Sequence, residues 1–318
     1  MLKIKLAISS ALAIASLLGS NAAARSAILF RDDFDGRNTV SSTFWQLPQL
    51  PIPAPGPGEP NPTFLGRTQL RLDRLPTVVD GIARLELNTF NPRNNSLQPG
   101  EIPSLLGSEV ITQQTFSRGK GLAVEARVRV NAPTLIGTEI QRGLLASLFL
   151  FASEPIGSNQ FLFNEIDFEF LTNAISQTAQ GPIPTVLTNV FANEPPGVGN
   201  PSFVGVENLD LTDFNTFRIE WLPNEVRWLV NDNLVFSNSV IVPDKPMKLH
   251  LNFWAPTNNF TAAFDSSLQP AFSAETNQAF FYEVDFVQVE QLAQSIPETN
   301  SVLALACVVG VLWLCAKR

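Results

Sequence analysis

Residues 161–170 read Phe-Leu-Phe-Asn-Glu-Ile-Asp-Phe-Glu-Phe. In a β-strand, successive side chains point to opposite faces of the sheet. The even-numbered positions of this stretch are then almost all apolar, as expected for a face that packs on a core. The odd-numbered positions place three carboxylates in a row, Glu165, Asp167 and Glu169. We therefore predict a strand with one buried face and one acidic face.

Short runs with the same alternation recur through the chain, at residues 83–90, 122–130, 217–221, 226–230, 248–254 and 281–289. Clusters of Pro, Gly and Asn separate them. Residues 231–233, Asn-Asp-Asn, are typical of a hairpin turn, because Asn and Asp tolerate positive φ. Residues 47–62 hold seven prolines and predict a loop. The pattern predicts a single all-β domain, a sandwich or a barrel, over residues 25–294.

The N-terminus differs from this body. Residues 1–24 combine a short basic start, an apolar run and small residues at positions 22–24. This combination is typical of a secretory signal peptide and is too short for a permanent membrane helix. We therefore expect the protein to be exported.

The C-terminus, residues 295–318, ends in a sixteen-residue apolar run and the basic pair Lys317-Arg318. The run is short for a membrane span, which needs about 20 residues. Together with Pro297-Glu298-Thr299, it resembles the PEP-CTERM sorting signal of bacterial surface proteins. The resemblance implies transient anchoring in the inner membrane, removal of the tail by a sorting enzyme, and a final place at the cell surface or in the extracellular matrix. A plain C-terminal anchor is the alternative; in both cases only the terminal segments would touch the membrane.

Composition excludes several classes of function. Both cysteines, Cys307 and Cys315, lie in the tail, so the body can form no disulfide, thiolate metal site or cysteine nucleophile. A chain with a formal charge of −8 is poorly suited to bind a phosphate backbone. We therefore expect no nucleic-acid partner and favour a neutral sugar polymer.

The acidic row suits the cleavage of a glycosidic bond, which needs one ionised and one protonated carboxyl group. A middle aspartate can help to keep the two pKa values apart. Strand positions four apart are ~13 Å apart, whereas a retaining mechanism needs the two carboxyl groups at ~5–5.5 Å. The outer glutamates must therefore lean together on a curved sheet. A solvated acidic face is the open alternative.

Residues 165–169, Glu-Ile-Asp-Phe-Glu, resemble the signature of glycoside hydrolase family 16, the family of lichenases and laminarinases. Companion segments follow in the order of that family, at residues 84–92, 107–110, 124–127, 217–221, 226–228, 252–254 and 284–287. The resemblance implies a jelly-roll β-sandwich with a concave, sugar-binding cleft. It also implies that Glu165 is the nucleophile, Glu169 the acid/base and Asp167 the assisting residue, with Glu169 titrating above Glu165.

Four other residues are candidates for substrate binding. His250, Asn252 and Trp254 share one side of the strand at residues 248–254, and the family match suggests that Trp254 stacks on sugar rings. His250 is the only histidine, and a satisfied structural histidine near the cleft is its alternative role. Asn189 resembles a family position opposite the acidic strand, where sugar binding and a polar strand rim both remain open.

Two further expectations concern stacking and metal. Residues 143–150 lack the tryptophans that family members commonly carry before the acidic strand, which suggests that a stacking platform is lost. The resemblance implies no required cofactor but allows a structural calcium ion, with Asp285 as a candidate ligand; hard oxygen ligands from elsewhere would have to complete the site.

The combined interpretation is an exported, retaining glycosidase of the endo-β-glucanase type. Its substrate would be a β-1,3- or mixed β-1,3/1,4-glucan, or a related exopolysaccharide. A transglycosylase with the same fold and a non-catalytic, carbohydrate-binding matrix protein are the alternatives.

Overall fold

The structure is a computed structural model that describes residues 26–48, 67–97, 99–100, 102–133, 140–157, 160–175, 183–195 and 198–293. They belong to one compact unit, Ser26–Gln294. The expected signal peptide, residues 1–24, and sorting tail, residues 295–318, lie outside the described residues. Within the described part of the chain, no helix is long and apolar enough to cross a membrane.

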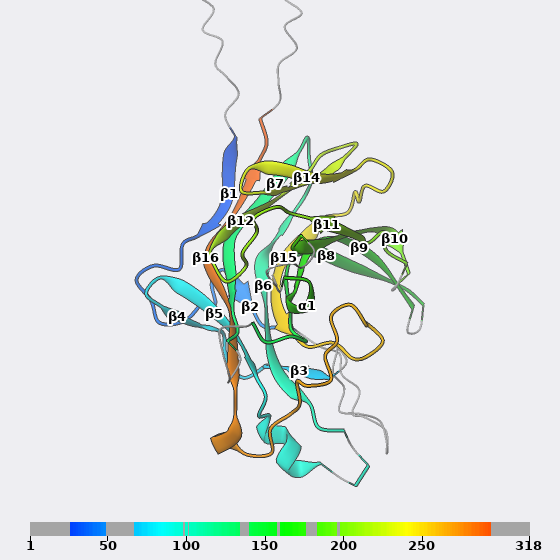
Figure 1. Cartoon of the computed structure of the whole chain (residues 1–318). Coiled ribbons are helices and arrows are strands. Elements are labelled where there is room, and N and C mark those ends of the chain that lie inside the picture. The colour runs from blue at the N-terminus through cyan, green and yellow to red at the C-terminus, as the bar shows by residue number, and fades with distance from the viewer. Residues whose placement is uncertain are drawn as a thin grey trace, which may run out of the picture. The chain divides into compact units, whose positions relative to one another are not determined.

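The unit is built almost entirely of strands (Figure 1). They are β1 (Ala27–Asp32), β2 (Trp45–Gln46), β3 (Thr68–Leu70), β4 (Thr77–Val79), β5 (Ile82–Asn88), β6 (Leu105–Phe116), β7 (Leu122–Asn131), β8 (Leu145–Gly157), β9 (Gln160–Leu171), β10 (Thr185–Glu194), β11 (Ser202–Gly205), β12 (Asn215–Trp221), β13 (Val226–Val230), β14 (Asn233–Asn238), β15 (Met247–Trp254) and β16 (Ala279–Gln291). One short α-helix, α1 (Thr172–Ile175), and two 3₁₀ turns, η1 (Pro92–Ser96) and η2 (Ala274–Thr276), join them. The all-β prediction is confirmed.

The strands run in the order β11-β10-β9-β8-β15-β6-β5-β16-β7-β12-β13-β14. Strand β6 belongs to both layers: it pairs with β15 over most of its length and with β5 through Leu106 and Asn88. The chain thereby folds one sheet over the other and forms the predicted β-sandwich. The acidic strand β9 lies between β8 and β10, away from either edge of its layer.

The sandwich core lies between the two layers and holds the apolar face of β9. Ile166, Phe168 and Phe170 are fully buried, as the alternation predicts. The rings of Phe168 and Phe170 pack on Phe217 of β12, with centroids 5.3 and 4.5 Å apart. Burying each such ring stabilises the fold by roughly 1.5–3 kcal/mol. This packing directs the carboxylates of β9 to the outer face of the layer.

The predicted hairpin turn is also present. Asn231 and Asp232 join β13 to β14 with φ values of 46° and 65°. Positive φ at both central residues matches the twist of the flanking strands.

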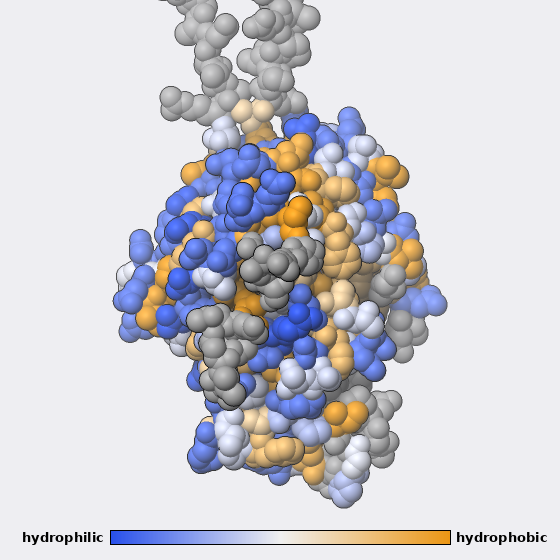
Figure 2. Space-filling model, in the orientation of Figure 1, coloured by the Kyte–Doolittle hydropathy of each residue, from blue (hydrophilic) through white to orange (hydrophobic). Residues whose placement is uncertain are grey.

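On the molecular face drawn in Figure 2, hydrophobic residues are interspersed with hydrophilic ones.

Candidate active site

The register of the strands brings polar and aromatic side chains together on the outer face of the layer that holds β9. Residues directly opposite each other in neighbouring strands point to the same face. On β8 and β10, Glu165 is opposite Phe151 and Phe191, Asp167 is opposite Phe149 and Asn189, and Glu169 is opposite Ser147 and Leu187. The three carboxylates therefore share one face, which lies outside the sandwich core.

Asp167, the central carboxylate, is held most tightly. Its side chain is only 3% exposed, and its Oδ1 is buried without a hydrogen-bond partner in the described residues. From the core side, the indole Nε1 of Trp228 donates a hydrogen bond to the Asp167 carbonyl at 2.8 Å. Burial, and then repulsion from Glu165 and Glu169, raises the pKa of Asp167 well above its usual range.

The outer glutamates also retain their protons to unusually high pH. Burial, followed by repulsion from Glu169 and Glu109, raises the pKa of Glu165 to about 8. Burial raises the pKa of Glu169 to about 7. This order is opposite to the expected one, because repulsion from Glu169, and then from Glu109, adds to burial at Glu165, whereas burial alone raises the pKa of Glu169. Since the groups interact, the two apparent pKa values belong to the pair.

Glu109 is the acidic residue of this face that sequence reasoning missed. It lies on β6, is 4% exposed, and has its Oε1 2.7 Å from Nδ1 of His250 on β15. The available signal was a single charged residue within the otherwise uncharged residues 102–116. Its partner is 141 positions away in the chain, so only the fold brings the two together.

Asn252, Trp254 and Asn189, three of the candidate substrate-binding residues, lie on the same layer in different surroundings. Asn252 is 4% exposed, and its Oδ1 finds no partner among the described residues. Trp254 is partly buried against a small cluster that includes Leu145, Leu171, Leu187 and Ala263, and its Nε1 is likewise unpaired within the described chain. Asn189 accepts a hydrogen bond from the backbone N–H of Val190 at 3.0 Å.

An aromatic row crosses this face beside the carboxylates. His250 packs on Phe149 with centroids 4.7 Å apart, and Phe149 lies 6.4 Å from Phe151. Phe151 continues to Phe163 at 5.0 Å, and Phe163 to Phe191 at 6.3 Å. Strand β8 thus carries phenylalanines on this face although it lacks tryptophans, and the expected loss of a stacking platform stays a prediction.

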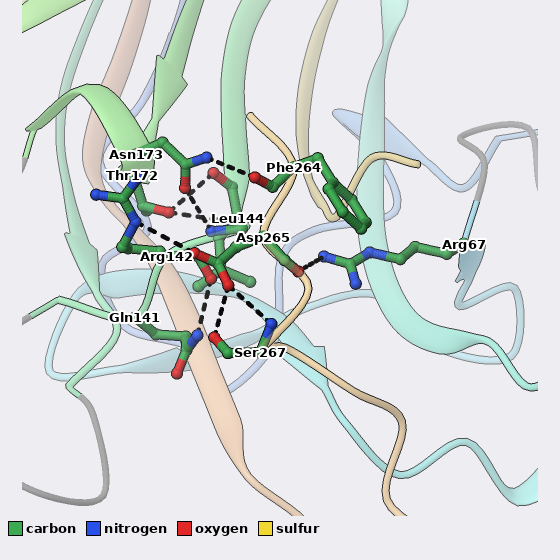
Figure 3. A network of polar contacts seen from close by, with 10 residues as sticks. Arg67, Gln141, Arg142, Leu144, Thr172, Asn173, Phe264, Asp265 and Ser267 are labelled. Carbon is green, nitrogen blue, oxygen red and sulfur yellow. Dashed lines mark hydrogen bonds and ion pairs between the residues drawn. The ribbon is translucent and has the colours of Figure 1, made fainter. Parts of the chain in front are cut away.

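A polar network fixes the loop after β15 against the start of β8 and the end of β9, as Figure 3 shows. Arg142 donates to Asp265 at 3.2 Å, and Arg67 donates to the Asp265 carbonyl at 3.0 Å. Asn173, just after β9, accepts from the Gly143 N–H at 2.8 Å and donates to the Phe264 carbonyl at 2.8 Å. Through Asn173, the end of β9 is therefore connected both to the start of β8 and to the loop that follows β15.

The structure does not support a calcium site at Asp285. Its Oδ2 accepts a hydrogen bond from the guanidinium of Arg127 at 2.5 Å, so an arginine supplies the positive charge. Neighbouring Glu283 is similarly held between Arg84 and Arg129, at 2.8 and 2.6 Å. No group of three or more His, Cys, Asp or Glu residues in the described ranges is arranged to hold a metal ion.

Comparisons with known proteins agree with this architecture. The family model described as glycosyl hydrolases family 16 matches residues 89–269. A beta-glucanase of Brevibacillus brevis is 29% identical over 134 residues, which are 41% of this chain and 47% of that protein, so the match spans about half the length of this relative.

Solved structures share the fold at lower identity. A lichenase from a mouse hindgut metagenome is 20% identical, with a TM-score of 0.55, and the match covers 83% of this chain and 99% of that one. The laminarinase catalytic domain of Thermotoga maritima is 16% identical, with a TM-score of 0.59, over 85% and 99%. Both likenesses concern the fold and agree with a jelly-roll sandwich. Because the family model covers more than half of the sequence, the chain belongs to glycosyl hydrolases family 16.

Proposed function

We propose that the chain is an exported endo-β-glucanase that cleaves a β-1,3- or mixed β-1,3/1,4-glucan with retention of configuration. The observation that carries this proposal is the row of Glu165, Asp167 and Glu169 on the outer face of the sheet, with raised pKa values. Strongly perturbed carboxyl groups cluster at active sites more often than elsewhere. Relatives named as beta-glucanases support the choice of substrate class.

The proposed mechanism divides the work between the two outer glutamates. Ionised Glu165 attacks the anomeric carbon, while protonated Glu169 transfers its proton to the leaving glycosidic oxygen. Glu169 then removes a proton from water, which attacks the glycosyl-enzyme and releases Glu165. Asp167 lies between them in the strand, and its raised pKa would let it donate a hydrogen bond to the ionised nucleophile. Between about pH 7 and 8 the pair retains one of its two protons. The mechanism uses the form in which this proton is on Glu169, although Glu165 has the higher pKa of the two.

Substrate contacts would use polar atoms that lack partners. Asp167 Oδ1, Asn252 Oδ1 and Trp254 Nε1 are buried and unpaired within the described residues. Leaving such atoms unsatisfied costs about 1–3 kcal/mol each, which a sugar hydroxyl could recover by hydrogen bonding. We propose Asn252 and Trp254 as binding residues through these atoms, and the aromatic row as the surface for the apolar faces of the sugar rings.

The decisive experiment is to incubate the purified protein with a panel of β-glucans and to determine product sizes. Shorter oligosaccharides support hydrolysis, longer transfer products would indicate a transglycosylase, and binding without cleavage would indicate a carbohydrate-binding protein. Glu169→Ala with an activated substrate and azide tests the stereochemistry. A β-glycosyl azide supports retention, whereas an α-azide contradicts the role of Glu165 as nucleophile.

Export and processing are part of the same proposal. The signal-like residues 1–24 and the tail at residues 295–318 support it. Cell fractionation followed by sequencing of both ends of the mature protein tests it. We expect a protein outside the inner membrane that lacks residues 1–24; a cytoplasmic protein with an intact N-terminus would contradict export, and an intact C-terminus would contradict removal of the tail.

A further inference from the structure

Glu109 and His250 form an ionisable pair on the face of the candidate site, and the mechanism above does not use it. Their strands, β6 and β15, are neighbours, and Glu109 is directly opposite Asn252. The Glu109 Oε1 to His250 Nδ1 distance is 2.7 Å, and the two residues are only 4% and 7% exposed. A carboxylate can only accept a hydrogen bond, so Nδ1 carries the proton when Glu109 is ionised.

The pair is connected to Glu165 through aromatic packing. The imidazole of His250 lies 4.7 Å from the Phe149 ring and 5.7 Å from the Phe151 ring, measured between centroids. Phe151 is directly opposite Glu165 on the neighbouring strand. The path from Glu109 to Glu165 therefore passes over apolar rings, which screen a charge less than water does. In agreement, Glu109 contributes to the raised pKa of Glu165.

The charges around Glu165 can be assigned strand by strand. Strand β9 adds Asp167 and Glu169, and β6 adds Glu109. Strand β8 presents Ser147, Phe149 and Phe151 to this face, and β10 presents Leu187, Asn189 and Phe191, all of them uncharged. The basic side chains of this face come from β15, where Lys248 and His250 share the face. In the described part of the site, the carboxylates of β9 and β6 are therefore faced by basic residues from one strand only, β15.

We propose that Glu109 and His250 act as a charge-balancing pair that controls how readily Glu165 takes up negative charge. The proposal rests on the proposed function, in which Glu165 is the nucleophile. Both residues act through Glu165 and are positioning residues. A positive charge on the imidazole offsets the negative charge of Glu109, whereas an unbalanced Glu109 carboxylate repels a second carboxylate on Glu165.

A carbon-13 NMR titration of labelled glutamate carboxyl groups tests the proposal directly. The Glu165 signal is assigned by its disappearance in Glu165→Gln. We expect Glu109→Gln to lower the pKa of Glu165 by about one pH unit, because a nearby like charge is removed. His250→Asn should raise it, because the amide can still donate to Glu109 but cannot become cationic.

Two further variants separate charge from packing. Glu109→Asp keeps the carboxylate and should leave Glu165 close to its wild-type pKa, although the shorter side chain alters packing more than the nearly isosteric Glu109→Gln does. Glu154→Gln removes an exposed carboxylate on the same layer, which pairs with Lys245 at 3.5 Å, and should have no effect. Opposite shifts for Glu109→Gln and His250→Asn support the proposal. Shifts of the same sign, or no shift from Glu109→Gln, would overturn it.

Kinetics supply an independent outcome. The pH profile of kcat/KM reports the ionisation of both carboxyl groups in the free enzyme, so its maximum should move to lower pH in Glu109→Gln and to higher pH in His250→Asn. If the wild-type protein cleaves no β-glucan, the proposed function fails while the NMR titration still decides the role of the pair. If it cleaves β-glucan but neither variant moves the titration, only the charge-balancing role fails.

Discussion

Replacing Glu165 with glutamine should make the protein more stable at alkaline pH. Glutamine has nearly the shape of glutamate but cannot ionise. The pKa of Glu165 rises from its ordinary value of 4.5 to about 8 in the folded protein. One pKa unit corresponds to about 1.4 kcal/mol, so ionising this group in the folded state costs about 5 kcal/mol at most. The variant should avoid that cost.

The direction of the pH dependence follows from proton binding. Between about pH 4.5 and 8 the folded state binds more protons at this site than the unfolded state. The free energy of unfolding of the wild-type protein therefore falls as pH rises through that window and levels off above it. The difference between variant and wild type should be under about 1 kcal/mol at pH 5 and several kcal/mol at pH 9.

Urea denaturation at pH 5 and pH 9 measures this difference. The fully buried Trp45 and Trp228 provide a fluorescence signal from within the sandwich. Glu154→Gln is the matched control, because it removes an exposed carboxylate and should change stability equally at both pH values. If Glu165→Gln also changes stability by the same amount at pH 5 and pH 9, burial does not disfavour the ionised form of Glu165, and the reasoning from pKa is wrong.

Three further predictions concern activity. Glu165→Gln should reduce turnover on any active glucan about a thousandfold or more, because the covalent step is lost; an unchanged kcat would contradict its role. The pH profile of kcat/KM should be a bell with its maximum between about 7 and about 8, since the pair loses its nucleophile at lower pH and its acid at higher pH; activity that stays constant into acid would contradict this. Gly199→Ala should raise KM several-fold, because a Cβ there would lie 2.5 Å from the Phe191 ring and 2.6 Å from Asn189 Oδ1; an unchanged KM would show that the loop does not shape the site.

The structural predictions from the sequence were most accurate for features that depend on neighbouring residues alone, such as strand alternation and turns. Alternation in β9 identified both its buried face and its acidic face, and the Asn231-Asp232 turn followed from the φ preferences of its residues. Strand β8 was harder, because residues 144–151 are apolar on both faces except for Ser147, and no alternation indicates which side is outward. Phe149 and Phe151 therefore become a surface of the site only through their register with β9.

Contacts between residues far apart in the sequence could not be predicted from local sequence patterns. Glu109 and His250 meet because β6 and β15 pair, and Asp285 meets Arg127 because β16 pairs with β7. In both cases a carboxylate that could serve a ligand or a metal is instead paired with a side chain from another strand, a histidine for Glu109 and an arginine for Asp285. The sequence around a single acidic residue does not show whether its carboxylate binds a ligand or a metal or instead pairs with a side chain from another strand.

Two core tryptophans of the opposite layer show how that layer supports the site, and they provide its most stringent test. Trp228 and Trp221 are both fully buried, and each donates one indole hydrogen bond to a carbonyl at 2.8 Å, Trp228 to Asp167 and Trp221 to Pro243. Replacing either with phenylalanine removes one such bond, so both variants should lose about 1–3 kcal/mol of unfolding free energy.

Only Trp228→Phe should also lower kcat, by several-fold, because its bond holds the backbone of β9 at Asp167, between the two glutamates. Small displacements of catalytic groups slow catalysis strongly. Equal losses of kcat in Trp228→Phe and Trp221→Phe, measured at a temperature where both remain folded, would show that stability alone is involved. A loss confined to Trp228→Phe would mean that the far layer of the sandwich positions the carboxylates as well as burying their strand.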